Sequence, residues 1–152
     1  MTDIVSPAKR SQMMSGIKAK DSHPERLVRR LLFSAGYRFR LHRRDLPGTP
    51  DIVLPRHKIA IFVHGCFWHM HAKCKYAKLP STRSEFWQEK LVGNVKRDQK
   101  AIDALVFSGW RVLTVWECST QNSAALAWLR ETLFGWIESG EISGEISGSK
   151  RD

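Results

Sequence analysis

The 152-residue chain is poor in cysteine, with only three, and an odd number this small does not build a disulfide framework. No window approaches the roughly 18 consecutive apolar residues of a membrane-spanning helix. The first 14 residues also lack the apolar run of a secretory signal. We therefore expect a cytoplasmic protein without a membrane segment. Hydrophobic residues still make up 42% of the chain, enough for the core of one domain.

Acidic residues are scarce where the chain is most basic. Residues 1–50 carry 11 basic and 4 acidic side chains, and residues 51–110 carry 10 and 5. Residues 111–152 carry 4 and 6, so the net charge of +10 belongs to the first two-thirds. This asymmetry favours a polyanionic partner. A basic protein that is merely soluble is the alternative.

Hydrophobic periodicity and turn residues predict the order α-β-β-β-α-β-α. The expected helices cover residues from about 22 to 35, 82–108 and 123–138, and the expected strands cover 37–41, 51–54, 58–65 and 110–117. Consecutive strands with short turns followed by a helical crossover predict a mixed sheet with helices packed on it. We expect one domain over 21–138, a mobile basic arm over 1–20 and a disordered tail over 139–152.

Three cysteines and one histidine form a compact set of soft ligands. Cys66, His71 and Cys74 lie within nine residues, and Cys118 directly follows a predicted strand. Three thiolates and one imidazole are the tetrahedral coordination of a structural zinc site. The loop 66–80 has few residues that could form a core, so a metal would hold it together. Three unrelated reduced thiols are the alternative.

Asp51 begins a predicted hairpin whose register can be worked out. A four-residue turn at 55–58 makes the numbers of paired residues sum to 113, which sets Asp51 opposite Phe62. The same register brings it close to the backbone carbonyl of Val63 and the side chain of His64. A carboxylate and a carbonyl oxygen at one end of a sheet suit Mg²⁺. A carboxylate that only caps a turn is an equally weighted alternative.

Two further carboxylates lie on predicted helices. Asp98 shares an apolar stripe, where an unpaired charge is costly, so it needs a partner. His64 or His69 could supply it, and a salt bridge with an arginine is the alternative. Glu25 completes a capping box with Ser22, and this motif explains the residue without any catalytic role. Its position on the predicted helix also turns Glu25 toward the sheet.

Bulky aromatic side chains surround the cysteine-bearing loop. Phe67 and Trp68 directly follow Cys66, and Trp87 lies near the start of the next helix. A bound metal would hold the first two rigid and exposed, which fits stacking against, or wedging into, nucleic acid. Core packing, the usual fate of such residues, is the alternative.

Four segments, in this order along the chain, resemble the very-short-patch-repair (Vsr) DNA mismatch endonucleases. They are LPGTPDIVLP, FVHGCFWHMH, STRSEFWQEKLVGNVKRD and SGWRVLTVWEC. The resemblance runs from about Arg10 to Cys118. The order of the segments is far more specific than any one of them.

The resemblance implies an enzyme that nicks duplex DNA on the 5′ side of the thymine in a T·G mismatch, which deamination of 5-methylcytosine produces. It implies an α/β fold with a restriction-endonuclease-like core, Mg²⁺ as catalytic metal and a structural Zn²⁺. We expect a monomer with a functional link to a cytosine-5 DNA methyltransferase.

The resemblance also assigns roles to single residues. The catalytic residues it implies are Asp51, His69, Asp98, His64 and Glu25. Mg²⁺ would lie on Asp51 and the backbone carbonyl of Val63, and zinc on Cys66, His71, Cys74 and Cys118. The intercalating side chains would be Phe67, Trp68 and Trp87, with Met14 of the arm entering from the other groove.

Two other functions stay open from the sequence. A zinc-stabilised DNA-binding module without chemistry would share the charge and the aromatics, but it would not need Asp51, His69 and Asp98. A restriction-type nuclease with a longer site is the second, and the arm and wedge residues argue only weakly against it.

Overall fold

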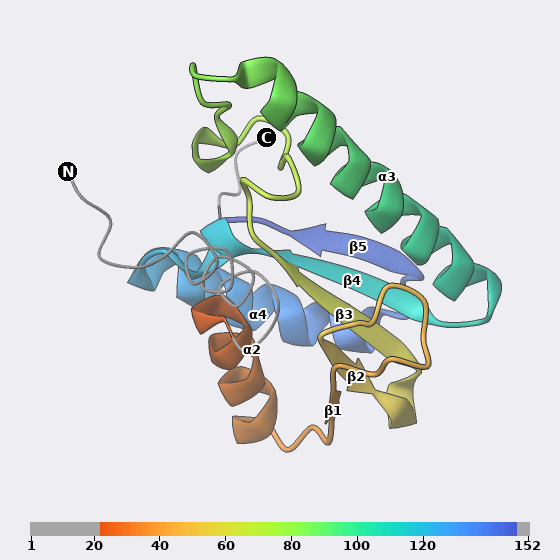
Figure 1. The fold of residues 1–152 in the computed structure, drawn as a ribbon. Coiled ribbons are helices and arrows are strands. Elements are labelled where there is room, and N and C mark those ends of the chain that lie inside the picture. The colour runs from red at the N-terminus through yellow and green to blue at the C-terminus, as the bar shows by residue number, and fades with distance from the viewer. Residues whose placement is uncertain (1–21, 149–152) are drawn as a thin grey trace, which may run out of the picture.

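A five-stranded mixed sheet forms the centre of the computed structural model, which describes residues 22–148 (Figure 1). In spatial order the strands are β1 (Arg40–Leu41), β2 (Ile52–Leu54), β3 (Ile59–His64), β4 (Arg111–Trp116) and β5 (Ser143–Ile146). The first three are antiparallel, whereas β3, β4 and β5 run parallel. The predicted mixed sheet is therefore confirmed. Met14 and the rest of the expected arm lie outside the described residues.

Helices cover both faces of the sheet. Helices α2 (His23–Ser34) and α4 (Ser123–Ser139) lie on one face, and α3 (Ser84–Phe107) lies on the other (Figure 1). The larger core lies under α2 and α4, where buried side chains such as Leu32 and Leu133 pack on the sheet. A smaller core joins Leu105 of α3 to the opposite face. None of the helices in residues 22–148 combines the length and hydropathy that a membrane span requires.

Strand β3 divides its side chains between these two cores. Ile59 and Ile61 belong to the core under α2 and α4, whereas Ala60 and Phe62 belong to the core under α3. Because side chains alternate along a strand, His64 at the end of β3 emerges on the α3 side. The end of β3 therefore delivers an imidazole to the space beside α3.

Two local predictions are confirmed in detail. Ile52 pairs with Ile61 and Val53 pairs with Ala60, which is the register predicted for the hairpin. Helix α2 begins after Ser22, whose side chain accepts a hydrogen bond from the backbone N–H of Glu25 at 3.3 Å. This cap satisfies one of the amide donors that a helix start leaves without an intrahelical partner.

The predicted disordered tail is wrong for residues 143–148. Residues 143–146 form β5 beside β4, and Ile146 is buried in the larger core. Residues 140–147 repeat the sequence GEIS, and this short repeat carries too little apolar periodicity to predict a strand. Pairing with β4 stabilises β5. The predicted strand 37–41 is also shorter than expected, because only Arg40 and Leu41 pair with β2.

Candidate active site

A cavity of about 510 Å³ opens where β3 ends. The chemically active side chains that line it are His42, Asp51, His64, His69 and Asp98, and Arg44 and Arg97 also border it. These residues come from the segments around β1 and β2, the end of β3, the following loop and α3. The fold thus gathers residues from across more than fifty positions of sequence into one polar cavity.

Asp51 lies immediately before β2 and is tied to β3. The backbone N–H of Val63 donates a hydrogen bond to Asp51 Oδ2 at 2.8 Å. The pKa of Asp51 is raised from 3.8 to about 7. Burial is the main cause and the negative charge of Glu25 adds to it, while the Val63 N–H and Arg29 oppose the shift. Ionising this carboxyl group is costly because it is buried, and a cation bound beside it would make the ionised form favourable.

Asp98 has the histidine partner that the sequence analysis anticipated. His69 Nδ1 lies 2.5 Å from Asp98 Oδ2. Because an ionised carboxylate only accepts, Nδ1 carries the hydrogen, and a neutral His69 then has an unprotonated Nε2. This is the arrangement of an oriented general base.

His64 packs against the same pair. Its ring lies parallel to that of His69, with centroids 3.7 Å apart, and His64 Nε2 lies 3.9 Å from Asp98 Oδ1. Burial lowers the pKa of His64 to about 3; the neighbouring His69 also lowers it, and Asp98 opposes both. His64 is therefore neutral at ordinary pH.

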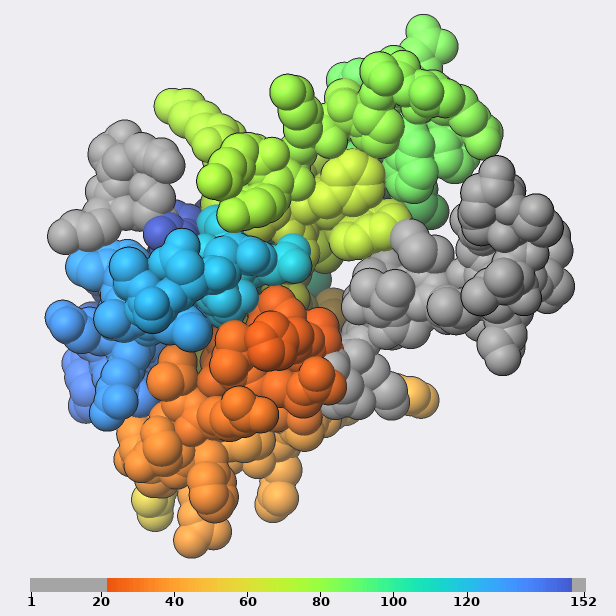
Figure 2. Space-filling view, turned by 90° about the vertical axis from the view of Figure 1, so that its left-hand side faces the viewer, coloured from red at the N-terminus to blue at the C-terminus, as the bar shows by residue number. Residues whose placement is uncertain are grey.

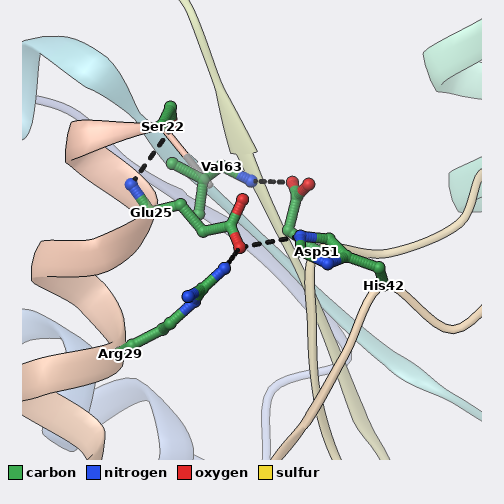
Figure 3. Close-up of polar contacts among 6 residues, drawn as sticks. All are labelled: Ser22, Glu25, Arg29, His42, Asp51 and Val63. Carbon is green, nitrogen blue, oxygen red and sulfur yellow. Dashed lines mark hydrogen bonds and ion pairs between the residues drawn. The ribbon is translucent and has the colours of Figure 1, made fainter. Parts of the chain in front are cut away.

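Glu25 reaches the site from the first turn of α2 (Figure 3). It is 1% exposed, so its carboxylate needs partners. Its Oε2 accepts from Arg29 of the same helix and lies 2.8 Å from His42 Nε2. The oxygen and nitrogen donors of Glu25, His42 and Asp51 lie within 4.8 Å of one another, which makes them a group able to hold a cation. Glu25 thus contributes its backbone N–H to the helix cap at Ser22 and its carboxylate to the site.

The four predicted zinc ligands converge on one point. One donor atom from each of Cys66, His71, Cys74 and Cys118 lies within 4.8 Å of the other three. Burial raises the pKa of the Cys66 and Cys118 thiols and lowers that of His71. A bound cation would lower the pKa of both thiols and so favour the thiolates that bind metal. The neutral imidazole of His71 is already the form that binds metal. The cluster is suited to a metal.

Neighbouring elements fix these ligands. The His71 ring stacks on Trp116 at the end of β4, with centroids 4.0 Å apart and planes 5° apart. The backbone N–H of Gly148 donates to Cys118 Sγ at 3.2 Å, so the segment after β5 supports the cluster. Such outer contacts orient metal ligands and are part of a metal site.

The aromatic residues form a cluster of their own between loop 66–80 and the start of α3. The Phe67 ring lies 5.1 Å from Trp68 and 5.5 Å from Trp87, and Phe86 lies 5.4 Å from Trp87. None of the four belongs to either buried core. In Figure 2 the yellow-green loop and the green start of α3 stand above the orange-red α2 and the blue α4. Core packing does not explain these side chains.

Comparison with known proteins decides the family. The family model for DNA mismatch endonuclease Vsr matches residues 2–75. The DNA mismatch endonuclease Vsr of Escherichia coli K12 is 42% identical over 148 residues, which span 96% of this chain and 94% of that protein. The chain belongs to the Vsr family of DNA mismatch endonucleases.

Two further Vsr relatives carry the name of nicking enzymes. The type II nicking enzyme V.XorIIP of Xanthomonas oryzae is 50% identical over 126 residues, covering 83% of this chain and 92% of that protein. V.NmeAIP of Neisseria meningitidis is 43% identical over 124 residues, covering 82% and 88%.

Membership in the Vsr family fixes the class of protein. The chain is a nuclease, and its mixed sheet with helices on both faces is a restriction-endonuclease-like α/β fold. The alternative of a DNA-binding module without chemistry is thereby wrong. A nuclease of this family uses a divalent metal.

The structure brings the predicted catalytic and metal-ligating residues into two groups. Asp51, His64, His69 and Asp98 share the cavity, Glu25 and Val63 border Asp51, and the four soft ligands form the second group. Two further residues of the site, His42 and Arg29, were not predicted from the sequence. Arg29 follows Glu25 by four residues on a helix, a spacing typical of ion pairs, whereas His42 gave no comparable signal.

Proposed function

We propose that this chain nicks duplex DNA on the 5′ side of the thymine at T·G mismatches left by deamination of 5-methylcytosine. The observation that carries the proposal is the His69–Asp98 pair, which lies in one cavity with the buried carboxylate of Asp51. Family membership supports the substrate class, since the relative from Escherichia coli is a mismatch endonuclease.

Asp51 and the backbone carbonyl of Val63 would hold Mg²⁺. The fit rests on the chemistry of the donors: a desolvated carboxylate, with the second carboxylate of Glu25 beside it, favours a hard cation. When bound, Mg²⁺ supplies charge stabilisation at the scissile phosphate. The Val63 N–H keeps the Asp51 carboxylate in one orientation.

His69 would act as the general base. Its Nδ1–H donates to Asp98, and this leaves Nε2 to take a proton from the attacking water. The water oxygen then bonds to phosphorus as a phosphodiester P–O bond breaks, and the sugar oxygen that leaves takes up a proton from solvent. Neutral His64, stacked on His69, holds the ring in place without adding a competing charge.

Zn²⁺ would occupy the cluster of Cys66, His71, Cys74 and Cys118. Three thiolates and one imidazole are a closed structural zinc set with no position left for substrate. The ion would hold loop 66–80 against the end of β4, which positions both His69 and the aromatic cluster.

Phe67, Trp68 and Trp87 would insert beside the mismatch. Their partial exposure and their mutual contacts outside the buried cores support this role. Opening a base step costs a few kcal/mol, and less where a mismatch stacks poorly, so wedges favour T·G sites. Met14 would enter from the opposite groove.

The proposed setting follows from the substrate. A monomer in the cytoplasm would act on mismatches that a cytosine-5 DNA methyltransferase makes possible, since the methylated base deaminates to thymine. The Xanthomonas and Neisseria relatives are named as nicking enzymes, which fits cleavage of one strand.

The test is a nicking assay on matched and T·G duplexes in a panel of cytosine-methylation contexts. Cleavage of the thymine strand alone, only at T·G and only with divalent metal, is the expected result. Equal cleavage of matched duplexes would instead favour a restriction-type nuclease.

A further inference from the structure

His42 connects the two carboxylate residues of the active site. Its backbone N–H donates to the carbonyl oxygen of Asp51 at 3.0 Å, and its side-chain Nε2 lies 2.8 Å from Glu25 Oε2. Asp51 precedes β2, whereas Glu25 lies on α2, so His42 is bonded to a residue of each element. Figure 3 shows the Glu25 carboxylate joined to the His42 ring, with the Asp51 side chain beside that ring.

The backbone of His42 is held in an unusual conformation. Its φ is +47°, in the left-handed region that residues other than glycine rarely adopt. Such strain persists only where surrounding contacts enforce it, and it gathers at functional sites. Here the conformation turns the chain directly after β1, so that the ring of His42 faces α2.

Three contacts described here hold Glu25, one on its backbone and two on its carboxylate. Its backbone N–H is bound by the Ser22 side chain, and its Oε2 is held by Arg29 from the next turn of α2 and by His42 from the sheet. Of these three, His42 alone connects Glu25 to a different element of the fold. Its side chain is 19% exposed, so the contact is largely shielded from water.

We propose that His42 is a positioning residue, which holds Glu25 at a fixed separation from Asp51 so that the two carboxylates act together on a divalent cation. The inference rests on the proposed function, because it takes Asp51 to be the metal-binding carboxylate. His42 acts through Glu25 and need not touch the DNA. An N–H donor at this position is the chemical requirement, since a carboxylate accepts it.

The variants separate the side-chain contact from the backbone. His42→Leu removes the donor but keeps bulk, and His42→Gly removes the donor while relieving the left-handed strain. His42→Gln keeps an N–H donor of similar reach. Lys58→Ala is the matched control, because Lys58 also has a left-handed φ, of 57°, at the opposite end of β2 and β3.

Each full-length variant is measured in two ways. The first is the Mg²⁺ concentration that half-saturates the rise in melting temperature of the protein without DNA. The second is the single-turnover nicking rate on a T·G duplex. His42→Gly and His42→Leu should raise the Mg²⁺ midpoint and lower the rate by at least about tenfold, the scale for losing a residue that orients a metal ligand. His42→Gln and Lys58→Ala should stay within about threefold of the unchanged protein on that scale.

Two outcomes would overturn the proposal. One is a folded His42→Gly protein with an unchanged Mg²⁺ midpoint and rate. The other is a His42→Gln protein as impaired as His42→Gly, which would leave the donor irrelevant. If the unchanged protein does not nick T·G duplexes at all, the proposed function fails, while the Mg²⁺ midpoints still decide the role of His42.

Discussion

His64 and His69 stack face to face, with ring planes inclined by only 2° and both rings turned toward Asp98. The two histidines differ in their surroundings. His64 is buried and its pKa is lowered to about 3, whereas His69 is one-quarter exposed at its side chain and donates directly to Asp98. In the proposed mechanism, the two parallel rings have different roles: His64 is a neutral support, and His69 is the general base that meets water.

Asp98→Asn tests the orientation of His69. The substitution keeps the size of the side chain but removes the charge that holds Nδ1–H in place. We expect the nicking rate on a T·G duplex to fall by about 100-fold or more, the scale of general base catalysis, with duplex binding unchanged. Single-turnover kinetics measure the rate. Asp103→Asn, on an exposed part of the same helix, is the control, and a similar rate for both variants would contradict the assignment.

Asp51→Asn should stabilise the protein in Mg²⁺-free buffer while abolishing nicking. The folded-state pKa of Asp51, about 7, lies above its ordinary value of 3.8, so the folded protein keeps this proton after the unfolded chain has lost it. The unfolding free energy of the unchanged protein should therefore decrease between about pH 4 and 7 through this group.

The variant should show no such decrease. Its unfolding free energy should exceed that of the unchanged protein by roughly 2–4 kcal/mol at pH 8. At about pH 3.5 the ionisation of residue 51 should add nothing to the difference between the two proteins. Urea denaturation at both pH values measures the gap. A gap that is the same at both pH values would show that Asp51 ionises without cost.

Cys118→Ala tests the metal cluster. We expect one Zn²⁺ per chain in the purified protein and substantially less in the variant, by elemental analysis. Because the metal would hold loop 66–80, the melting temperature should fall by roughly 5 °C or more, equivalent to a few kcal/mol. A metal-free protein that melts at the same temperature with and without Cys118 would exclude a structural zinc.

Trp68→Ala separates wedging from packing. Trp68 lies outside both buried cores, so the melting temperature should change little. Nicking at T·G should fall by roughly 10- to 100-fold, because opening a base step costs a few kcal/mol. Salt-dependent binding to ordinary duplex should persist. Phe107→Ala, an exposed aromatic at the end of α3, is the control. A joint loss of stability and of both activities would indicate a packing role.

The sequence predicted those parts of the fold that depend on local patterns. The register of β2 and β3 followed from one turn length, and the cap at Ser22 followed from a four-residue motif. A carboxylate on an apolar stripe needs a partner, so the sequence predicted one for Asp98, with His64, His69 or an arginine as the candidates. In the structure the partner is His69. The first two predictions needed only a few neighbouring residues, whereas His69 and Asp98 are 29 residues apart in the sequence.

Contacts between distant segments were not predictable in the same way. His42 lies in a left-handed turn that no glycine marks, and its contact with Glu25 depends on how α2 is set against the sheet. The strand β5 depends on the open edge of β4 and not on its own repeat. Both features arise from packing, which one sequence does not encode locally.

The segment that forms β5 has a practical consequence for shortening this protein. Residues 141–148 look like a dispensable polar repeat, yet their removal would expose a full row of unpaired amides and carbonyls along β4. It would also leave an apolar hole where Ile146 packs and take away the amide that faces Cys118. An exposed strand edge is a template for other chains, so a protein trimmed at Gly140 should aggregate before its catalytic residues can be assayed.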